Sequence, residues 1–167
     1  MALQLSHNST TLGLQKKSLI IICDGVDSPA NVGGLFRLSD ALGIQEIYFC
    51  KNRPDIKSVR LKRTARNTQT HIPYSYYENT VNAISFCLKN EYTVVALELS
   101  SKSQPLNTFK NDNNQKIALV LGNEKMGVSE EILQMIETHL HINMYGKNSS
   151  MNVVQAAAIA CYSLTKN

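Results

Sequence analysis

The chain has 167 residues, of which 43% are hydrophobic, and a formal net charge of +4. This length predicts a single domain with its own core over residues 18–167, after a loosely ordered polar tail at residues 1–17. No apolar run reaches the roughly 18 residues of a membrane span, and the tail lacks the apolar core of a signal peptide. The four cysteines are far apart and form no CxxC pair, which predicts free thiols and a cytoplasmic location.

Strands and helices are predicted to alternate along the chain. In chain order the pattern gives a strand at 18–23, a helix from 28 to 43, strands at 45–50 and near 71–74, a helix at 79–89, strands at 93–99 and 117–121, a helix at 129–136, a strand at 139–144 and a helix at 152–164. This alternation predicts an α/β fold with a mostly parallel sheet and helices on both faces.

Basic residues are concentrated in one segment, residues 51–66, which is expected to be irregular. It holds seven of the 17 lysines and arginines against a single acid. The seven are Lys51, Arg53, Lys57, Arg60, Lys62, Arg63 and Arg66. Such a cluster predicts a surface that contacts phosphates, with a solvated basic loop as the alternative. No aromatic residue is interleaved, so base stacking is not indicated in this segment.

Three segments follow predicted strands and lead into predicted helices: residues 31–43, 119–131 and 142–156. Ligands of open α/β sheets bind beyond the carboxyl ends of the strands, so these segments predict one composite site. The GxGxxG and GxxxxGK[ST] signatures are absent, which disfavours the common NAD and ATP sites. The histidines have no metal-ligand spacing, which predicts no metal site, and His139 and His141 are interpreted as structural.

The first segment places an asparagine, two glycines and an arginine at the start of a helix. Asn31 is expected to cap that helix. Gly33 and Gly34 leave a bare turn that a ligand or another backbone can approach. Arg37 lies four residues after Gly33, on nearly the same face, where it suits bidentate phosphate binding. The alternative is a surface arginine paired with Asp40.

The second segment brackets a carboxylate with two glycines. Gly122 is expected to let a ligand lie against the strand end, and Gly127 to permit a sharp turn. Ser129 is expected to cap the next helix, and Glu124 to hold the loop by accepting backbone N–H groups. A purely structural joint between strand and helix is the alternative.

The third segment combines hydroxyls, an amide and apolar side chains before an alanine-rich helix. Ser149 or Ser150 could cap that helix. The polar groups beside Ile142, Met144 and Met151 could also bind a flat purine between apolar walls.

Taken together, N-x-G-x-x-x-R at 31–37, G-x-E-x-x-G at 122–127 and S-x-N at 150–152 resemble the three motifs of the TrmH (SpoU) branch of the SPOUT RNA methyltransferases. The resemblance covers about residues 18–165. It implies an α/β sheet with a C-terminal trefoil knot, S-adenosylmethionine bound in that knot, and a homodimer. It also implies methylation of a ribose 2′-oxygen in tRNA or rRNA, without a metal.

The resemblance also carries over residue roles. The positions that match the family's functional residues are Arg37, Asn31, Glu124, Ser150 and Asn152. Those that match its cofactor pocket are Leu97, Glu98, Gly122, Ile142, Met144 and Met151. The chain departs from the family at Asn143, where proline is common, and at Met151, where leucine is commoner.

An arginine is a very poor base, so Arg37 is expected to grip the RNA phosphate beside the target ribose and so help polarise the 2′-hydroxyl. Ser150 and Asn152 would orient the ribose and its loop. The residues expected to bind the RNA backbone are Lys57, Arg60, Arg63 and Arg66. A stand-alone domain favours tRNA over rRNA. A catalytically silent RNA-binding dimer and an unrelated NAD or ATP enzyme are the other hypotheses.

Overall fold

In the computed structural model, residues 18–110 and 115–165 are described, and the predicted tail at residues 1–17 lies outside them. Their strands form one sheet in the order β3-β2-β1-β6-β4-β7-β5. The strands are β1 (Leu19–Asp24), β2 (Glu46–Cys50), β3 (Tyr74–Tyr77), β4 (Tyr92–Leu97), β5 (Gln104–Pro105), β6 (Lys116–Gly122) and β7 (Thr138–His141). Every pair of neighbouring strands is parallel, which confirms the predicted fold class.

Helices cover both faces of this sheet. They are α1 (Pro29–Leu42), α2 (Val59–Ala65), α3 (Thr80–Lys89), α4 (Glu130–Met135) and α5 (Val153–Thr165), with 3-10 turns at Thr68–Thr70 and Leu106–Thr108. Residues of α1, α2 and α5 share one buried apolar cluster, and residues of α3 and α4 share the other. All six residues of β1 are buried, as expected for a parallel strand covered on both faces.

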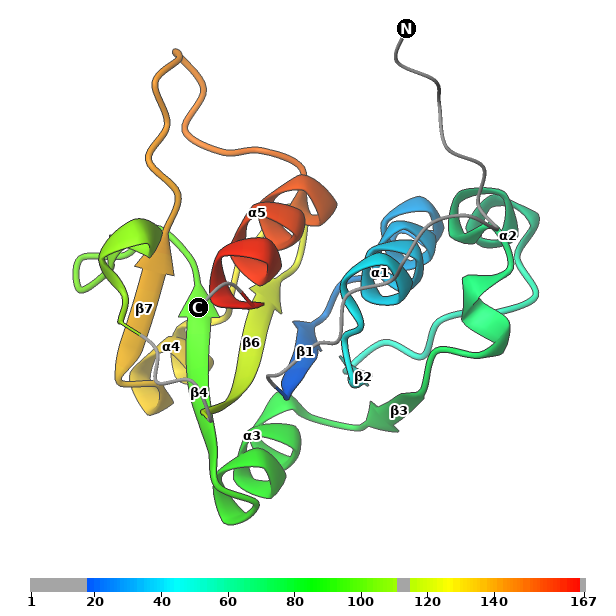
Figure 1. Ribbon diagram of the computed structural model, residues 1–167, viewed down its shortest axis with the longest axis horizontal. Helices are drawn as coiled ribbons and strands as arrows, with labels where there is room; N and C mark the ends of the chain where they lie inside the picture. The colour runs from blue at the N-terminus through cyan, green and yellow to red at the C-terminus, as the bar shows by residue number, and fades with distance from the viewer. Residues whose placement is uncertain (1–17, 111–114, 166–167) are drawn as a thin grey trace, which may run out of the picture.

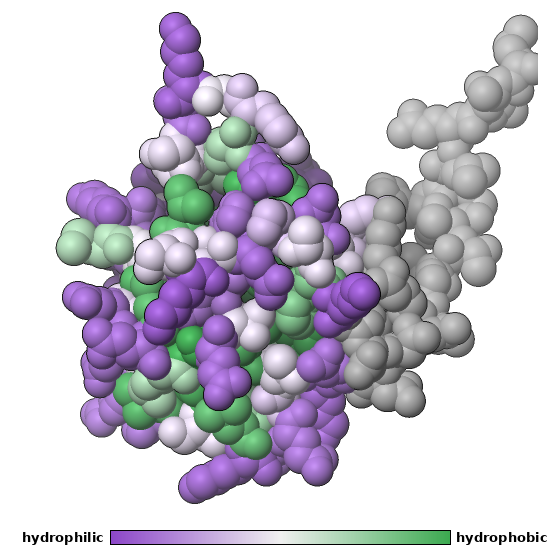
Figure 2. Space-filling view, turned by 90° about the vertical axis from the view of Figure 1, so that its left-hand side faces the viewer, coloured by the Kyte–Doolittle hydropathy of each residue, from purple (hydrophilic) through white to green (hydrophobic). Residues whose placement is uncertain are grey.

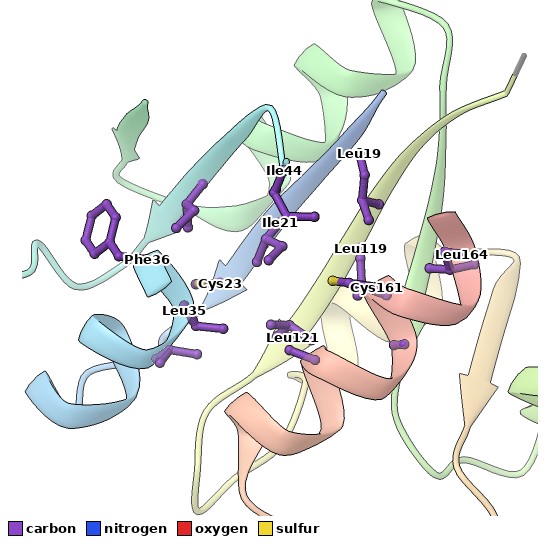
Figure 3. Packing of buried hydrophobic residues seen from close by; sticks show 14 of the residues in the cluster. Leu19, Ile21, Cys23, Leu35, Phe36, Ile44, Leu119, Leu121, Cys161 and Leu164 are labelled. Carbon is purple, nitrogen blue, oxygen red and sulfur yellow. The ribbon is translucent and has the colours of Figure 1, made fainter. Parts of the chain in front are cut away.

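Alternating side chains of the central strands feed the two clusters. Leu19, Ile21 and Cys23 point to the α1–α5 side, whereas Ile20 and Ile22 belong to the α3–α4 side. Figure 3 shows side chains of α1 and α5 directed at β1 and β6 from the same side. The two helices therefore lie over the middle of the sheet, with their N-terminal ends near the edge where the strands finish (Figure 1).

The basic segment contains a helix that the sequence did not indicate. Residues 59–65 form α2, and only Leu61 and Ala65 of this helix are buried. Three apolar residues among four charged or polar ones, without helical spacing beyond one pair, give too weak a periodicity to predict a helix. The prediction of an irregular segment was therefore wrong over this range.

Two glycines set the distances between α1 and its neighbours. A Cβ added at Gly33 would lie 2.5 Å from the carbonyl oxygen of Leu61 in α2. One added at Gly34 would lie 2.9 Å from Cγ2 of Val154 in α5. The close approach predicted at these glycines thus comes from neighbouring helices and not from a ligand. It brings α2 and α5 to opposite sides of the first turns of α1.

Hydrophilic side chains cover much of the face in Figure 2, with smaller hydrophobic areas between them. Within the described residues, no helix is both long and apolar enough to span a membrane. Because all strands run in one direction, the ends of β1, β4, β6 and β7 meet at one edge of the sheet. The polar loops that follow these strands therefore converge there, as the sequence predicted.

Candidate active site

A chain of hydrogen bonds links the three sequence segments. Nδ2 of Asn31 donates to Oε1 of Glu124 at 2.7 Å, and Nδ2 of Asn152 donates to Oδ1 of Asn31 at 3.0 Å. Oε1 of Glu124 also accepts from the backbone N–H of Ser28 at 3.3 Å. Residues about a hundred positions apart are thereby held side by side at the carboxyl edge of the sheet.

The helix caps differ from those predicted. Ser28 occupies the N-cap position of α1, and Asn31 lies inside the first turn, where its amide is used by the Glu124–Asn152 chain. At α5, Oδ1 of Asn152 accepts from the N–H of Val154 at 2.9 Å. Asn152 therefore caps this helix, and the alternative of a cap from Ser149 or Ser150 does not apply. As the third residue of the helix, Asn31 reaches loops that the N-cap residue does not reach. The local sequence pattern does not reveal such contacts between distant segments.

The second segment forms a tight loop that closes on itself. The backbones of Asn123 and Gly127 exchange hydrogen bonds of 3.0 and 2.9 Å, and Gly127 turns the chain with a φ of +68°. A Cβ at Gly122 would lie 2.1 Å from the backbone of Gly127. The absence of a side chain at Gly122 thus lets the loop fold back against the end of β6.

Two carboxylates, at the ends of the strands on either side of β6, hold this loop. Oε2 of Glu98 accepts from the N–H of Val128 at 3.0 Å. Oδ2 of Asp24 accepts from both the N–H and the hydroxyl of Ser129, at 2.9 and 2.8 Å. The Ser129 hydroxyl consequently makes no capping bond to α4, contrary to prediction. The ends of β1 and β4 determine where the loop lies.

Asp24 is a residue that the sequence analysis missed. Its side chain is only 1% exposed, and its Oδ1 lies 2.7 Å from Nζ of Lys51 and accepts a hydrogen bond from Thr80. Burial favours the neutral acid, but the hydrogen bonds from Lys51, Thr80 and Ser129 outweigh it and lower the pKa of the Asp24 carboxyl. A lone acid at the end of an apolar strand was the available signal. Lys51, from the basic segment, is used in this network.

A cavity of about 530 Å³ opens between these loops. All six residues predicted to bind a cofactor line it, namely Leu97, Glu98, Gly122, Ile142, Met144 and Met151. Asn31, Glu124, Ser150 and Asn152 line it as well. Its volume is in the range of small-molecule sites, and it combines apolar walls with a few convergent polar groups.

A second, more open depression lies between α1, α2 and α5. Its lining includes three arginines, Arg37, Arg63 and Arg66, together with Asn31 and Asn152. The other two predicted RNA-binding residues, Lys57 and Arg60, line neither space. The structure thus brings three of the five predicted phosphate-binding cations together, and they meet next to the cavity.

Arg37 is exposed on α1 and has no hydrogen bond or ion pair with another described residue. The alternative pairing with Asp40 does not occur, because Asp40 lies 2.8 Å from Nε2 of His71 instead. The Arg37 guanidinium is therefore available to an external group at the edge of the second depression.

The histidines are engaged in the protein framework. Nε2 of the buried His139 faces the carbonyl oxygens of Leu133 and Ile136 at 2.9 Å, which confirms its interpretation as structural. His141 lies 3.1 Å from Oδ1 of Asn143, the residue that departs from the family pattern. Across residues 18–110 and 115–165, no cluster of three His, Cys, Asp or Glu side chains could hold a metal ion.

The parallel sheet, the convergent loops and the cavity define an α/β protein with a composite ligand site at its carboxyl edge. The SpoU rRNA Methylase family model matches residues 18–162. The chain therefore belongs to the SpoU methylase family, in agreement with the resemblance of its three motifs.

Individual relatives include enzymes named for different RNAs. The chain is 30% identical over 176 residues to tRNA (guanosine(18)-2′-O)-methyltransferase of Saccharomyces cerevisiae, with 98% of the chain and 11% of that protein covered. It is 28% identical over 151 residues to 23S rRNA (guanosine(2553)-2′-O)-methyltransferase RlmP of Bacillus subtilis, with 87% and 57% covered. The chain thus spans less than two thirds of the length of these relatives.

The fold is also shared with solved structures. The AdoMet-bound rRNA methyltransferase from Sinorhizobium meliloti superposes with a TM-score of 0.80 at 24% identity. The match covers 88% of this chain and 55% of that one. This likeness establishes the fold.

Proposed function

We propose that the protein transfers a methyl group from S-adenosylmethionine to a ribose 2′-hydroxyl of RNA. The observation that carries this proposal is the arrangement of the two spaces. Asn31 and Asn152 line both the cavity and the arginine-lined depression. A methyl donor in the cavity and an RNA backbone in the depression would therefore meet at these two asparagines.

The cavity residues suit S-adenosylmethionine. Apolar side chains of Leu97, Ile142, Met144 and Met151 would contact the adenosine, and the carbonyl and N–H groups of the surrounding loops would bind its polar edges. Glu98 already binds Val128 and Leu99, so its role would be to shape the cavity wall. When bound, the sulfonium supplies an electrophilic methyl group, for which no metal is required.

The role of the chain is to position the RNA and to help remove one proton. The guanidinium of Arg37 can donate two parallel hydrogen bonds to two oxygens of one phosphate. Arg37 would therefore bind the phosphate beside the target nucleotide. Arg63 and Arg66 would bind phosphates along the same depression. Asn31, Glu124 and Asn152 would act together, because their hydrogen bonds to one another set the junction between the spaces. Ser150 is exposed on the cavity wall and would orient the ribose.

The RNA phosphate would accept a hydrogen bond from the 2′-hydroxyl and so polarise it, and the Arg37 guanidinium would stabilise the negative charge that develops on the 2′-oxygen. Holding both reactants in one geometry converts a bimolecular reaction into an effectively unimolecular one, which is a large part of what such an enzyme must supply. The proton would pass to the phosphate oxygen or to water, since an arginine stays charged at every physiological pH.

The RNA is proposed to be tRNA, with rRNA as the second candidate because the related RlmP is named for 23S rRNA. The yeast relative, named for tRNA, aligns with 98% of this chain, which supports the first candidate. A cytoplasmic location is proposed as well, and the four cysteines, all free and buried, fit it.

We also expect a homodimer, as the resemblance implies. Ile159 and Tyr162 on α5 are 45% and 53% exposed, which fits a helix that packs on a second copy. Sedimentation of the purified chain at the monomer mass would contradict this expectation. The trefoil knot implied by the resemblance stays a prediction.

The test of the proposed function is methyl transfer from labelled S-adenosylmethionine to unmodified tRNA and, in parallel, unmodified rRNA. Mass spectrometry of the nucleosides then identifies the product. A 2′-O-methyl nucleoside in tRNA is expected. The same product only in rRNA would make rRNA the substrate in place of tRNA. A base-methylated product, or no transfer to either RNA, would overturn the proposal.

A further inference from the structure

Tyr145 belongs to the connection between β7 and α5, residues 142–152. This connection extends from the carboxyl edge of the sheet, where β4 and β6 also end (Figure 1). The Tyr145 side chain is 95% exposed, which is the largest exposed fraction among the large hydrophobic and aromatic side chains described. Its neighbour in the chain, Met144, lines the cavity, so Tyr145 follows directly after a residue of the cavity wall.

Nine of the other aromatic side chains make contacts within the protein. Those with ring contacts, a cation above the ring or a place in the core are Phe36, Phe49, Phe86, Phe109, Tyr48, Tyr74, Tyr76, Tyr77 and Tyr92. Tyr145 has no ring contact and no hydrogen bond with any residue of the described ranges. Both faces of its ring are therefore open to an external partner.

The surroundings of Tyr145 are cationic and polar. Lys147 follows two residues later on the same loop, and Lys125 is exposed on the second loop at the cavity. A Cβ at Gly146 would meet no atom within 4 Å, so the loop is uncovered on that side too. An open aromatic ring on a loop that also carries a lysine is complementary to a nucleobase and its phosphate.

We propose that Tyr145 stacks on a nucleobase that flanks the target nucleotide. The inference rests on the proposed function, and it adds a contact to a base where Arg37, Arg63 and Arg66 contact only the backbone. A nucleotide whose ribose reaches Asn31 and Asn152 must have neighbours close to the loops that line the cavity, and Tyr145 belongs to one of these loops. Stacking on an aromatic side chain selects unpaired bases, so the target would lie in a loop or another single-stranded region.

A second copy of the chain is a poorer occupant for this ring. The centres of protein interfaces are depleted in lysine, and every residue from 143 to 150 is exposed and most are polar, with Lys147 among them. Stacking on a base tolerates solvent at the ring edge, which suits an exposed residue of a loop.

The test compares Tyr145→Ala, Tyr145→Leu and Tyr145→Phe with the wild type. Binding of labelled unmodified tRNA and rRNA transcripts is measured with S-adenosylhomocysteine present, and S-adenosylhomocysteine affinity is measured separately. Loss of one stacked base raises the Kd for RNA by roughly 5- to 150-fold, which is expected for alanine and leucine. Phenylalanine keeps the ring and should bind RNA like the wild type. Cofactor-product affinity should be the same in all four proteins.

Each outcome decides between the proposals. Equal RNA affinity of Tyr145→Ala and wild type would overturn the stacking proposal alone, as would a phenylalanine variant as weak as alanine. A change of molecular mass in Tyr145→Ala would instead assign the ring to an interface between copies. If the wild type binds neither RNA, the proposed function and this inference both fail.

Discussion

Asp24 joins the end of β1 to the loop that frames the cavity, and its ionisation should affect stability. Its folded-state pKa is lowered, whereas an unfolded aspartate has a value near 3.9. The unfolded chain therefore takes up the proton first as the pH falls. The stabilisation is complete above about pH 5 and is lost as the pH falls through the folded-state pKa.

The substitution Asp24→Asn should remove this contribution. It keeps the size of the side chain but loses the charge that Lys51 and Ser129 face, so we expect a loss of roughly 1.5–3 kcal/mol in the free energy of unfolding at pH 7. Urea unfolding between pH 7 and pH 3 measures the effect. The difference in the free energy of unfolding between the wild type and Asp24→Asn should shrink as the pH falls.

Asp40→Asn is the matched control for this prediction. Asp40 also has a side-chain partner, since Nε2 of His71 lies 2.8 Å from its Oδ1, but the Asp40 side chain is 49% exposed. Exposed pairs contribute little, so this variant should differ from the wild type by less than about 1 kcal/mol. A stability difference for Asp24→Asn that stays constant down to pH 3 would show that its charge is not the cause.

At the residue scale, sequence reasoning identified the participants better than their contacts. Asn31, Glu124 and Asn152 were predicted as site residues from the resemblance of their motifs to the family, and the structure brings all three together. Their hydrogen bonds to one another were not predictable, because they join segments that are distant in the chain. Asp24 was missed for the same reason, since all its partners come from other elements.

At the scale of elements, the contact between α1 and α2 depends on the absence of a side chain at Gly33. An added Cβ would lie 2.5 Å from a backbone oxygen of α2, so Gly33→Ala must push the helices apart. We expect a loss of roughly 1–3 kcal/mol from this overpacking, although alanine is the better helix former. Thermal or urea unfolding measures it.

Gly146→Ala provides the comparison, because an added Cβ there meets no atom within 4 Å. It should change the free energy of unfolding by less than about 0.5 kcal/mol. Equal effects of the two substitutions would contradict the close approach of α1 and α2.

The helix α2 also offers a test of where RNA lies. Arg63→Gln with Arg66→Gln removes two cations from the depression, whereas Lys57→Gln with Arg60→Gln removes two from outside it. For a single-stranded RNA the first pair should flatten the slope of log affinity against log salt by about 1.4, or 0.7 for each phosphate that the protein no longer neutralises. The second pair has the same net charge and should change the slope less.

Filter binding at several salt concentrations measures both slopes. A larger change of slope for the second pair would show that the RNA contacts residues 57–60 and not the depression. Sequence alone could not make this distinction. It identified a cluster of cations, but which of them meet Arg37 depends on the unpredicted helix and on its packing against Gly33.

At the scale of the whole molecule, the alternation of strands and helices was sufficient to predict a parallel α/β sheet with its site at the carboxyl edge. The order of the strands was not predictable, since β6 and β4 insert between β1 and β7 through long-range pairing. Without that order, neither the cavity nor the depression could be placed. The family motifs supplied the residues, and the sheet order supplies the reason that they meet.

The central claim is that one space binds the methyl donor, a second binds the RNA, and the two meet at Asn31 and Asn152. Arg37 lines only the second space. Its substitution should therefore separate the two functions.

The most direct test measures methyl transfer and S-adenosylmethionine affinity for Arg37→Ala and Arg37→Lys. Misplacement of a reacting group can cost about 100-fold in rate, so Arg37→Ala should lose at least that much transfer while its cofactor affinity stays at the wild-type value. Arg37→Lys keeps the charge but not the paired N–H donors of the guanidinium. Its rate of methyl transfer should lie between those of the wild type and Arg37→Ala. An Arg37→Ala variant that loses cofactor affinity and transfer in equal measure would contradict the division into two spaces.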